Sequence, residues 1–93
     1  MELDAQAFTD GTMLDTDVCI VGAGPAGLVL AAELIGQRCD VILLESGAAR
    51  PEAAILGLND GDSVGDVYAG LGETRRRGIG GTSAAWNTTV ARA

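Results

Sequence analysis

The sequence predicts an α/β fold built on one βαβ unit, and three features carry this prediction. Two short runs, residues 18–21 and 41–44, are continuously apolar, as parallel strands covered on both faces usually are. An Ala- and Leu-rich stretch between them is typical of a helix. A G-x-G-x-x-G motif at residues 22–27 joins the first run to that stretch, in the order that a dinucleotide-binding fingerprint requires. The unit is therefore Rossmann-like.

The composition of the chain argues against several classes of function. The 93 residues can form one small domain, with 13 acidic side chains against 6 arginines and a net charge of −7. Such a surface repels phosphate backbones and anionic lipid, which argues against nucleic-acid or membrane binding. The chain has no histidine, the commonest general base and metal ligand, and we predict neither a metal site nor a catalytic residue. Cys19 and Cys39 form no CxxC motif, and we expect reduced structural thiols, the first on a buried strand.

The lead-in segment carries no chemistry that we can recognise. Residues 1–16 have neither the basic start nor the apolar centre of a signal peptide, and no apolar run is long enough for a bilayer, so we expect a cytoplasmic protein. Met13 and Leu14 could form a short edge segment before the first strand.

The elements of the βαβ unit follow in order. We expect a strand over 17–21, then a helix that starts with Pro25 and runs to about Ile35, where Gly36 stops it. Because this helix is apolar nearly all round, a further surface should pack on it. A second strand over 40–45 completes the unit through a right-handed crossover. Beyond it, residues 52–58 could form a short helix and residues 59–62 a turn.

The first glycine motif has the chemistry of a dinucleotide site. Gly22 permits a tight turn, Gly24 lets the backbone approach a pyrophosphate, and Gly27 lets helix and strand pack closely. The helix start offers N–H groups and a partial positive charge to the phosphates. Seventeen residues separate Gly27 from Glu45, which ends the second strand, where it can accept hydrogen bonds from ribose hydroxyls. A 2′-phosphate would meet like charge there, which disfavours NADP. The motif alone does not separate FAD from NAD.

A second glycine element follows at residues 75–87. Its Gly-Gly-Thr-Ser can present consecutive N–H groups and two hydroxyls to an anion or to a flavin edge. The arginines before it, Arg75, Arg76 and Arg77, are either a solvated charge run or ligand contacts. Trp86 is either a core aromatic or a neighbour of the ligand.

Together the stretches DVCIVGAGPAGLVLAAEL, VILLESG and RRRGIGGTSAAWN resemble the N-terminal flavin-binding part of glucose-methanol-choline (GMC) type FAD-dependent oxidoreductases. The likeness is to the bacterial branch, whose second motif reads roughly R-x-R-x-x-GGT-[ST]-x-x-W. Residues 59–71 are similar to its D-G-x-x-V-G-x-x-Y-x-x-L, so that the resemblance covers almost the whole chain. One departure is that Ala85 and Trp86 stand where the wider family has an aliphatic residue and then Asn or His; Asn87 follows one position later.

The resemblance implies FAD as cofactor. The first glycine turn would cradle the pyrophosphate, Glu45 would hold the adenosine ribose with Ser46 beside it, and the second motif would lie against the pyrophosphate and the flavin ring. The cofactor-binding candidates are Gly22, Gly24, Pro25, Ala26, Gly27, Glu45, Ser46, Arg77, Gly80, Gly81, Thr82, Ser83, Trp86 and Asn87.

The same resemblance implies a reaction. In the family a substrate alcohol gives a hydride to flavin N5, and a histidine near the C-terminus takes the hydroxyl proton. This chain has no histidine, so we expect the N-terminal fragment of a larger enzyme, with no activity of its own. The alternatives are a small FAD-binding module or subunit completed by a partner chain and, less favoured, an NAD-binding domain. We divide the chain into a lead-in (1–16) and a partial FAD-binding domain (17–93), made of the βαβ unit (17–46), a connecting segment (47–74) and the second glycine motif (75–87).

Overall fold

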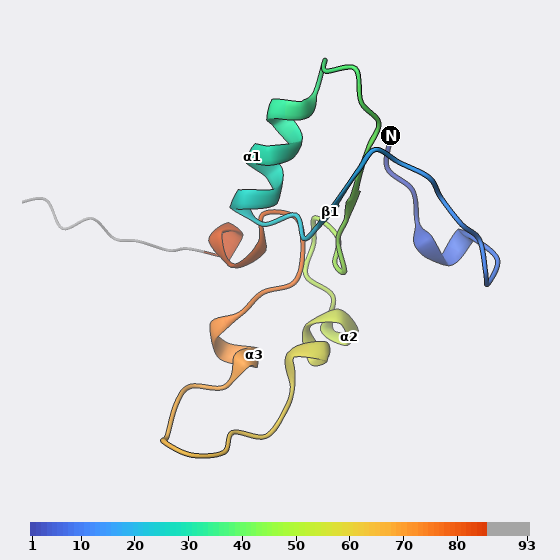
Figure 1. The fold of residues 1–93 in the computed structure, drawn as a ribbon. Helices are drawn as coiled ribbons and strands as arrows, with labels where there is room; N and C mark the ends of the chain where they lie inside the picture. Colours follow the sequence, from blue (N-terminus) through green and yellow to red (C-terminus); the bar gives the residue numbers. More distant parts are fainter. Residues whose placement is uncertain (86–93) are drawn as a thin grey trace, which may run out of the picture.

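A parallel βαβ unit forms the centre of the computed structural model, which describes residues 1–85 (Figure 1). Strand β1 (Val18–Val21) leads into helix α1 (Pro25–Leu34), and strand β2 (Val41–Leu44) returns beside β1. The two strands pair in parallel from Val18 opposite Val41 to Val21 opposite Leu44. This confirms the predicted order of strand, helix and strand, with each strand a residue shorter at one or both ends than expected.

The ends of α1 follow from its sequence. Gly24 is the N-cap and Pro25 the first helical residue, where a missing N–H costs nothing. At the other end the Ile35 N–H bonds to the carbonyls of Ala31 and Ala32, and Gly36 adopts φ +84°. That left-handed conformation favours glycine, so Gly36 stops the helix as predicted.

The remaining elements are single turns. They are the 3-10 turn η1 (Ala5–Ala7), helix α2 (Ala53–Leu56), the 3-10 turn η2 (Gly57–Asn59), helix α3 (Leu71–Thr74) and the 3-10 turn η3 (Gly81–Ala85). The helix expected over 52–58 is thus present, but it tightens into η2 halfway along.

The edge segment proposed at Met13 and Leu14 is wrong. Neither residue lies in a strand, and both side chains are exposed. Contact of this part of the chain with the residue before β2 begins at Thr16, whose hydroxyl donates to the Asp40 carbonyl, and the N–H groups of Asp17 and Val18 donate to the same oxygen.

The core is very small. Among the described residues only Ile20 and Ala23 are buried hydrophobics, and α1 is the helix that packs on the sheet. Our expectation that both faces of the strands are covered is therefore wrong: Val21 is 82% and Leu44 50% exposed. Cys19 is exposed for the same reason, since side chains alternate along a strand and Ile20 takes the covered face.

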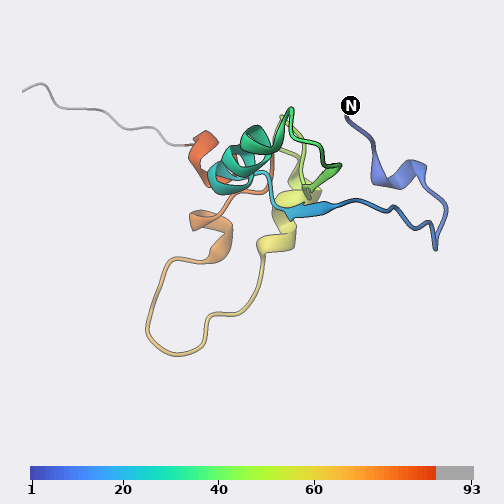
Figure 2. The same ribbon diagram turned by 45° about the horizontal axis from the view of Figure 1, so that its top comes forward.

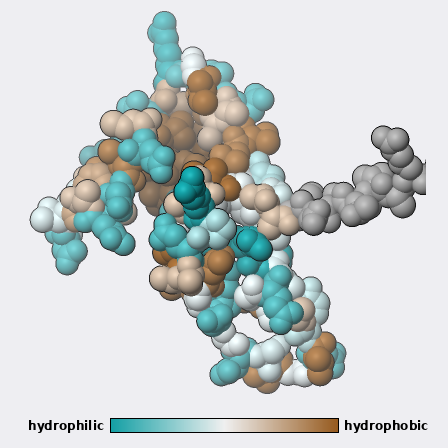
Figure 3. Space-filling model, turned by 180° about the vertical axis from the view of Figure 1, so that it is seen from behind, coloured by the Kyte–Doolittle hydropathy of each residue, from teal (hydrophilic) through white to brown (hydrophobic). Residues whose placement is uncertain are grey.

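Much of the chain lies away from this unit. The radius of gyration is 16.5 Å, against about 12 Å for a compact domain of this length. Figure 2 shows the lead-in and the loop between η2 and α3 projecting to either side of the βαβ unit. From behind, hydrophobic residues gather in the upper part of the molecule (Figure 3). Val29, Leu30 and Ile35 of the α1 region are also largely exposed, so the further surface expected on this helix is absent from residues 1–85.

Candidate cofactor site

The first glycine turn has the geometry that its sequence predicts. Gly22 adopts φ +100°, and its N–H donates to the Leu44 carbonyl at 2.7 Å, which ties the turn to the end of β2. A Cβ at Gly27 would overlap the Gly22 carbonyl oxygen, so only glycine lets α1 pack so closely on the turn. The roles predicted for Gly22 and Gly27 in the fold therefore agree with the structure.

The start of α1 is open to a ligand. No side chain caps this end of the helix, and the space that a Cβ at Gly24 would occupy contains no atom within 4 Å. The Gly24 carbonyl accepts the Leu28 N–H, whereas the N–H groups of Ala26 and Gly27 have no hydrogen-bond partner in the part of the chain that the structure describes. Unpaired N–H groups and the partial positive charge at a helix start suit a pyrophosphate.

Glu45 connects three parts of the site. Its Oε2 accepts the Ala23 N–H of the first turn at 2.8 Å, and its Oε1 accepts the N–H groups of Gly47 at 3.0 Å and Gly78 at 3.1 Å. The Ser46 hydroxyl donates to Oε1 at 3.3 Å. Since a carboxylate oxygen can accept more than one hydrogen bond, Oε2 keeps capacity for a ribose hydroxyl. Glu45 is thus also a structural bridge, a role that its place after an apolar strand does not indicate.

These contacts act on the acidity of Glu45. Partial burial, the largest influence, raises the pKa of the carboxyl group. The backbone N–H groups of Ala23, Gly47 and Ser46 and the Ser46 hydroxyl lower it, and together they outweigh the burial. The pKa of Glu45 therefore lies below its ordinary value, and the side chain is a carboxylate at neutral pH.

The second glycine element lies directly on the first turn. The Gly80 N–H donates to the Ala23 carbonyl at 2.7 Å, and a Cβ at Gly81 would stand 3.2 Å from the Gly24 Cα. Figure 1 shows this segment beside the start of α1. The structure thus brings together two motifs that lie more than fifty residues apart in the sequence.

The hydroxyls of this element are not equivalent. Ser83 donates its proton to the Gly80 carbonyl at 2.6 Å, so in this arrangement the proton is not available to a ligand. Thr82 accepts the Arg76 N–H at 3.1 Å and keeps its proton. Trp86 and Asn87 lie outside the described residues.

The three arginines separate into two kinds. Arg75 and Arg76 are exposed, whereas Arg77 is half-buried. The Arg77 Nε–H donates to Asn59 Oδ1 at 2.8 Å, and Nη1 donates to the Ser46 hydroxyl at 3.2 Å. Arg77 is therefore placed beside Glu45. Sequence reasoning missed Asn59, because an Asn-Asp-Gly run is most simply interpreted as a turn.

An open depression of about 400 Å³ lies where both strands end, the edge at which ligands bind in parallel α/β sheets. It is lined by Val21, Gly22, Leu44, Glu45, Ser46 and Arg77. The guanidinium of Arg77 and the carboxylate of Glu45 thus lie around one opening, next to the glycine turn that leads into α1, and these residues fit a dinucleotide such as FAD.

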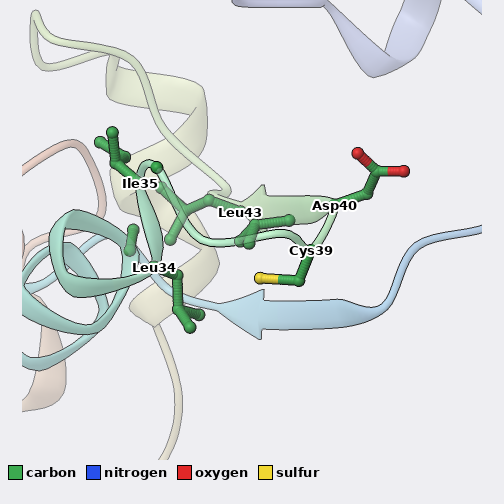
Figure 4. A pocket seen from close by; sticks show the side chains of 8 residues that line it. Leu34, Ile35, Cys39, Asp40 and Leu43 are labelled. Atoms are coloured by element: carbon green, nitrogen blue, oxygen red, sulfur yellow. The ribbon is translucent and has the colours of Figure 1, made fainter.

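A second depression, of about 300 Å³, lies at the opposite end of the unit, between the end of α1 and the start of β2. The residues that line it include Leu34, Ile35, Cys39, Asp40 and Leu43, which are labelled in Figure 4. The Asp40 carboxylate points away from the apolar side chains (Figure 4). This depression has no group of residues suited to a cofactor. Within residues 1–85, no three His, Cys, Asp or Glu side chains gather as a metal site would need.

Residues 15–53 match a family model described as an FAD binding domain. The match covers β1, the first glycine turn, α1, β2 and Glu45, and it ends before the second glycine element. No curated protein and no solved structure matches the chain. The match supports FAD as the cofactor and agrees with the Rossmann-like βαβ unit. In the described part of the chain, no helix has the length and apolar character needed to cross a membrane.

Proposed function

We propose that this chain is the FAD-binding part of an oxidoreductase of the GMC type, which oxidises a CH–OH donor, and that it has no activity alone. The observation that supports this best is the contact between the two glycine motifs, in which Gly80 donates to the Ala23 carbonyl. A glycine-rich element closing over the start of α1 is of use to a flavin cofactor and has no place in an ordinary NAD domain. The bacterial GMC resemblance, which extends to this element, supports the choice of enzyme class.

Bound FAD would supply a two-electron acceptor at its flavin ring. The start of α1 would bind the pyrophosphate through the N–H groups of Ala26 and Gly27, and Gly24 would leave room for it. Glu45 would orient the adenosine ribose through Oε2. The histidine that the resemblance assigns as the base is not among these 93 residues, so proton removal from the alcohol would be done by a group outside this chain.

Uptake of FAD tests the placement of the cofactor. In the chain carrying Gly24→Val, we expect FAD binding to be lost, because the side chain would occupy the space through which the pyrophosphate approaches, and its Cβ would have no protein atom within 4 Å apart from its chain neighbours. Gly61→Val is the matched control, since a Cβ at Gly61 would likewise have no atom within 4 Å and the residue has no positive φ. FAD titration by flavin fluorescence measures both, and unchanged affinity in Gly24→Val would place the cofactor elsewhere.

A second candidate function is that of an FAD-binding subunit completed by a partner chain. The exposed Val29 and Leu30 side chains of α1 need a covering surface, which a partner chain would supply as well as a continuation of this chain would. Reading the DNA beyond the codon for Ala93 separates the two candidates. A continuation in frame that supplies further family motifs and a histidine supports the fragment, whereas a neighbouring reading frame with those motifs supports the subunit.

A further inference from the structure

Arg77 is fixed at two of its nitrogen atoms by residues from two other segments. Asn59, at the end of η2, accepts from Nε at 2.8 Å, and Ser46, after β2, accepts from Nη1 at 3.2 Å. Asn59 is itself anchored, because its amide Nδ2 donates to the Arg75 carbonyl at 3.1 Å. The guanidinium is therefore held in one orientation over the site.

The charge of Arg77 is not neutralised by these contacts. Both acceptors are neutral oxygens, and within residues 1–85 the other guanidinium N–H groups donate no hydrogen bond. The guanidinium lines the same depression as the Glu45 carboxylate, yet no hydrogen bond joins the two. An oriented guanidinium with unused N–H groups is suited to bidentate binding of a phosphate.

We propose that Asn59 is a positioning residue that, with Ser46, directs Arg77 at the diphosphate of the adenosine half of FAD. This rests on the proposed placement of the cofactor in the depression where the strands end. The physical basis is pre-organisation: an arginine side chain already held in the binding orientation loses less conformational freedom when the phosphate arrives.

Calorimetric titration of the full chain with ADP and with adenosine tests this role. Asn59→Ala should weaken ADP binding about tenfold, as expected when a long side chain must be ordered on binding, and should leave adenosine binding unchanged. Arg77→Ala should weaken ADP binding at least as much, and the double variant should be no worse than Arg77→Ala, because Asn59 acts through Arg77. Gln37→Ala removes an exposed amide just beyond the C-terminal end of α1, opposite the end that begins at the glycine turn, and serves as the control.

Asn59→Asp separates positioning from a purely structural role. The aspartate keeps an acceptor for the Nε–H, loses the donor to the Arg75 carbonyl, and adds a negative charge against the guanidinium. We expect a thermal midpoint no lower than that of Asn59→Ala, which loses the same donor, while ADP affinity falls and becomes less sensitive to salt. A residue that only supports the fold would give the reverse, namely intact ADP binding in this variant.

The outcomes distinguish this inference from the proposed function. Wild-type binding of FAD and ADP together with unchanged ADP affinity in Asn59→Ala would overturn the role of Asn59 alone. An equal loss of ADP and adenosine affinity would also overturn it, because the effect would then not depend on phosphate. Failure of the wild-type chain to bind either FAD or ADP would refute the proposed function and this inference together.

Discussion

Glu45→Gln tests the bridge between the two glycine motifs. The carboxylate accepts four hydrogen bonds, three from backbone N–H groups and one from a hydroxyl. A glutamine amide has only one acceptor oxygen. If this oxygen takes the place of Oε1, the contacts with Gly47 and Gly78 remain, but the amide nitrogen then faces the Ala23 N–H, donor against donor. The opposite orientation loses more contacts, so the first is expected.

The free energy lost in Glu45→Gln follows from this hydrogen-bond geometry. One charge-assisted hydrogen bond is lost, and the remaining ones become neutral, which for a half-buried group amounts to about 2 kcal/mol. This corresponds to roughly a 30-fold change in a local opening equilibrium. We therefore expect the amide proton of Ala23 to exchange with solvent about 30-fold faster in Glu45→Gln than in the wild-type chain.

Amide hydrogen exchange measured by NMR follows Ala23 and Gly78 individually. Glu33→Gln is the matched control, since it makes the same chemical change and the same change in net charge on an exposed position of α1. Unchanged exchange at both Ala23 and Gly78 in Glu45→Gln would refute the bridging role of the carboxylate.

Two further predictions concern the same site. Gly27→Ala should disrupt the turn and abolish FAD binding, because its Cβ would overlap the Gly22 carbonyl oxygen. Circular dichroism would measure the folding of the variant, and titration would measure its affinity for FAD. A variant that folds and binds FAD would contradict the close packing. The pKa of Glu45 is lowered from 4.5, so the folded chain binds this proton less tightly than the unfolded chain. The stabilisation by Glu45 should therefore be complete at neutral pH and be lost as the pH falls below about 4.5 and passes the lowered pKa. Unfolding curves of the wild type and of Glu45→Gln should accordingly differ at neutral pH and converge at acid pH.

The βαβ unit and its ligand class could be predicted without any structure. The apolar runs, Pro25 and Gly36 define the elements through local rules that need no distant contact. Gly22, Gly24 and Gly27 indicate a dinucleotide because their spacing corresponds to one turn and the start of one helix. The match of residues 15–53 to an FAD binding domain agrees with that interpretation.

The use of the second motif, in contrast, is visible only once the chain is folded. The contact of Gly80 with Ala23, the bridge from Glu45 to Gly78 and the hold of Asn59 on Arg77 join residues from 18 to more than 50 positions apart. Such contacts depend on how loops close in space, and no periodicity or spacing encodes them. The exposure of the strand side chains could not be predicted from the sequence either. Val21 and Leu44 have the hydrophobicity of covered strand residues, but whether a second layer covers them depends on what else packs on the sheet.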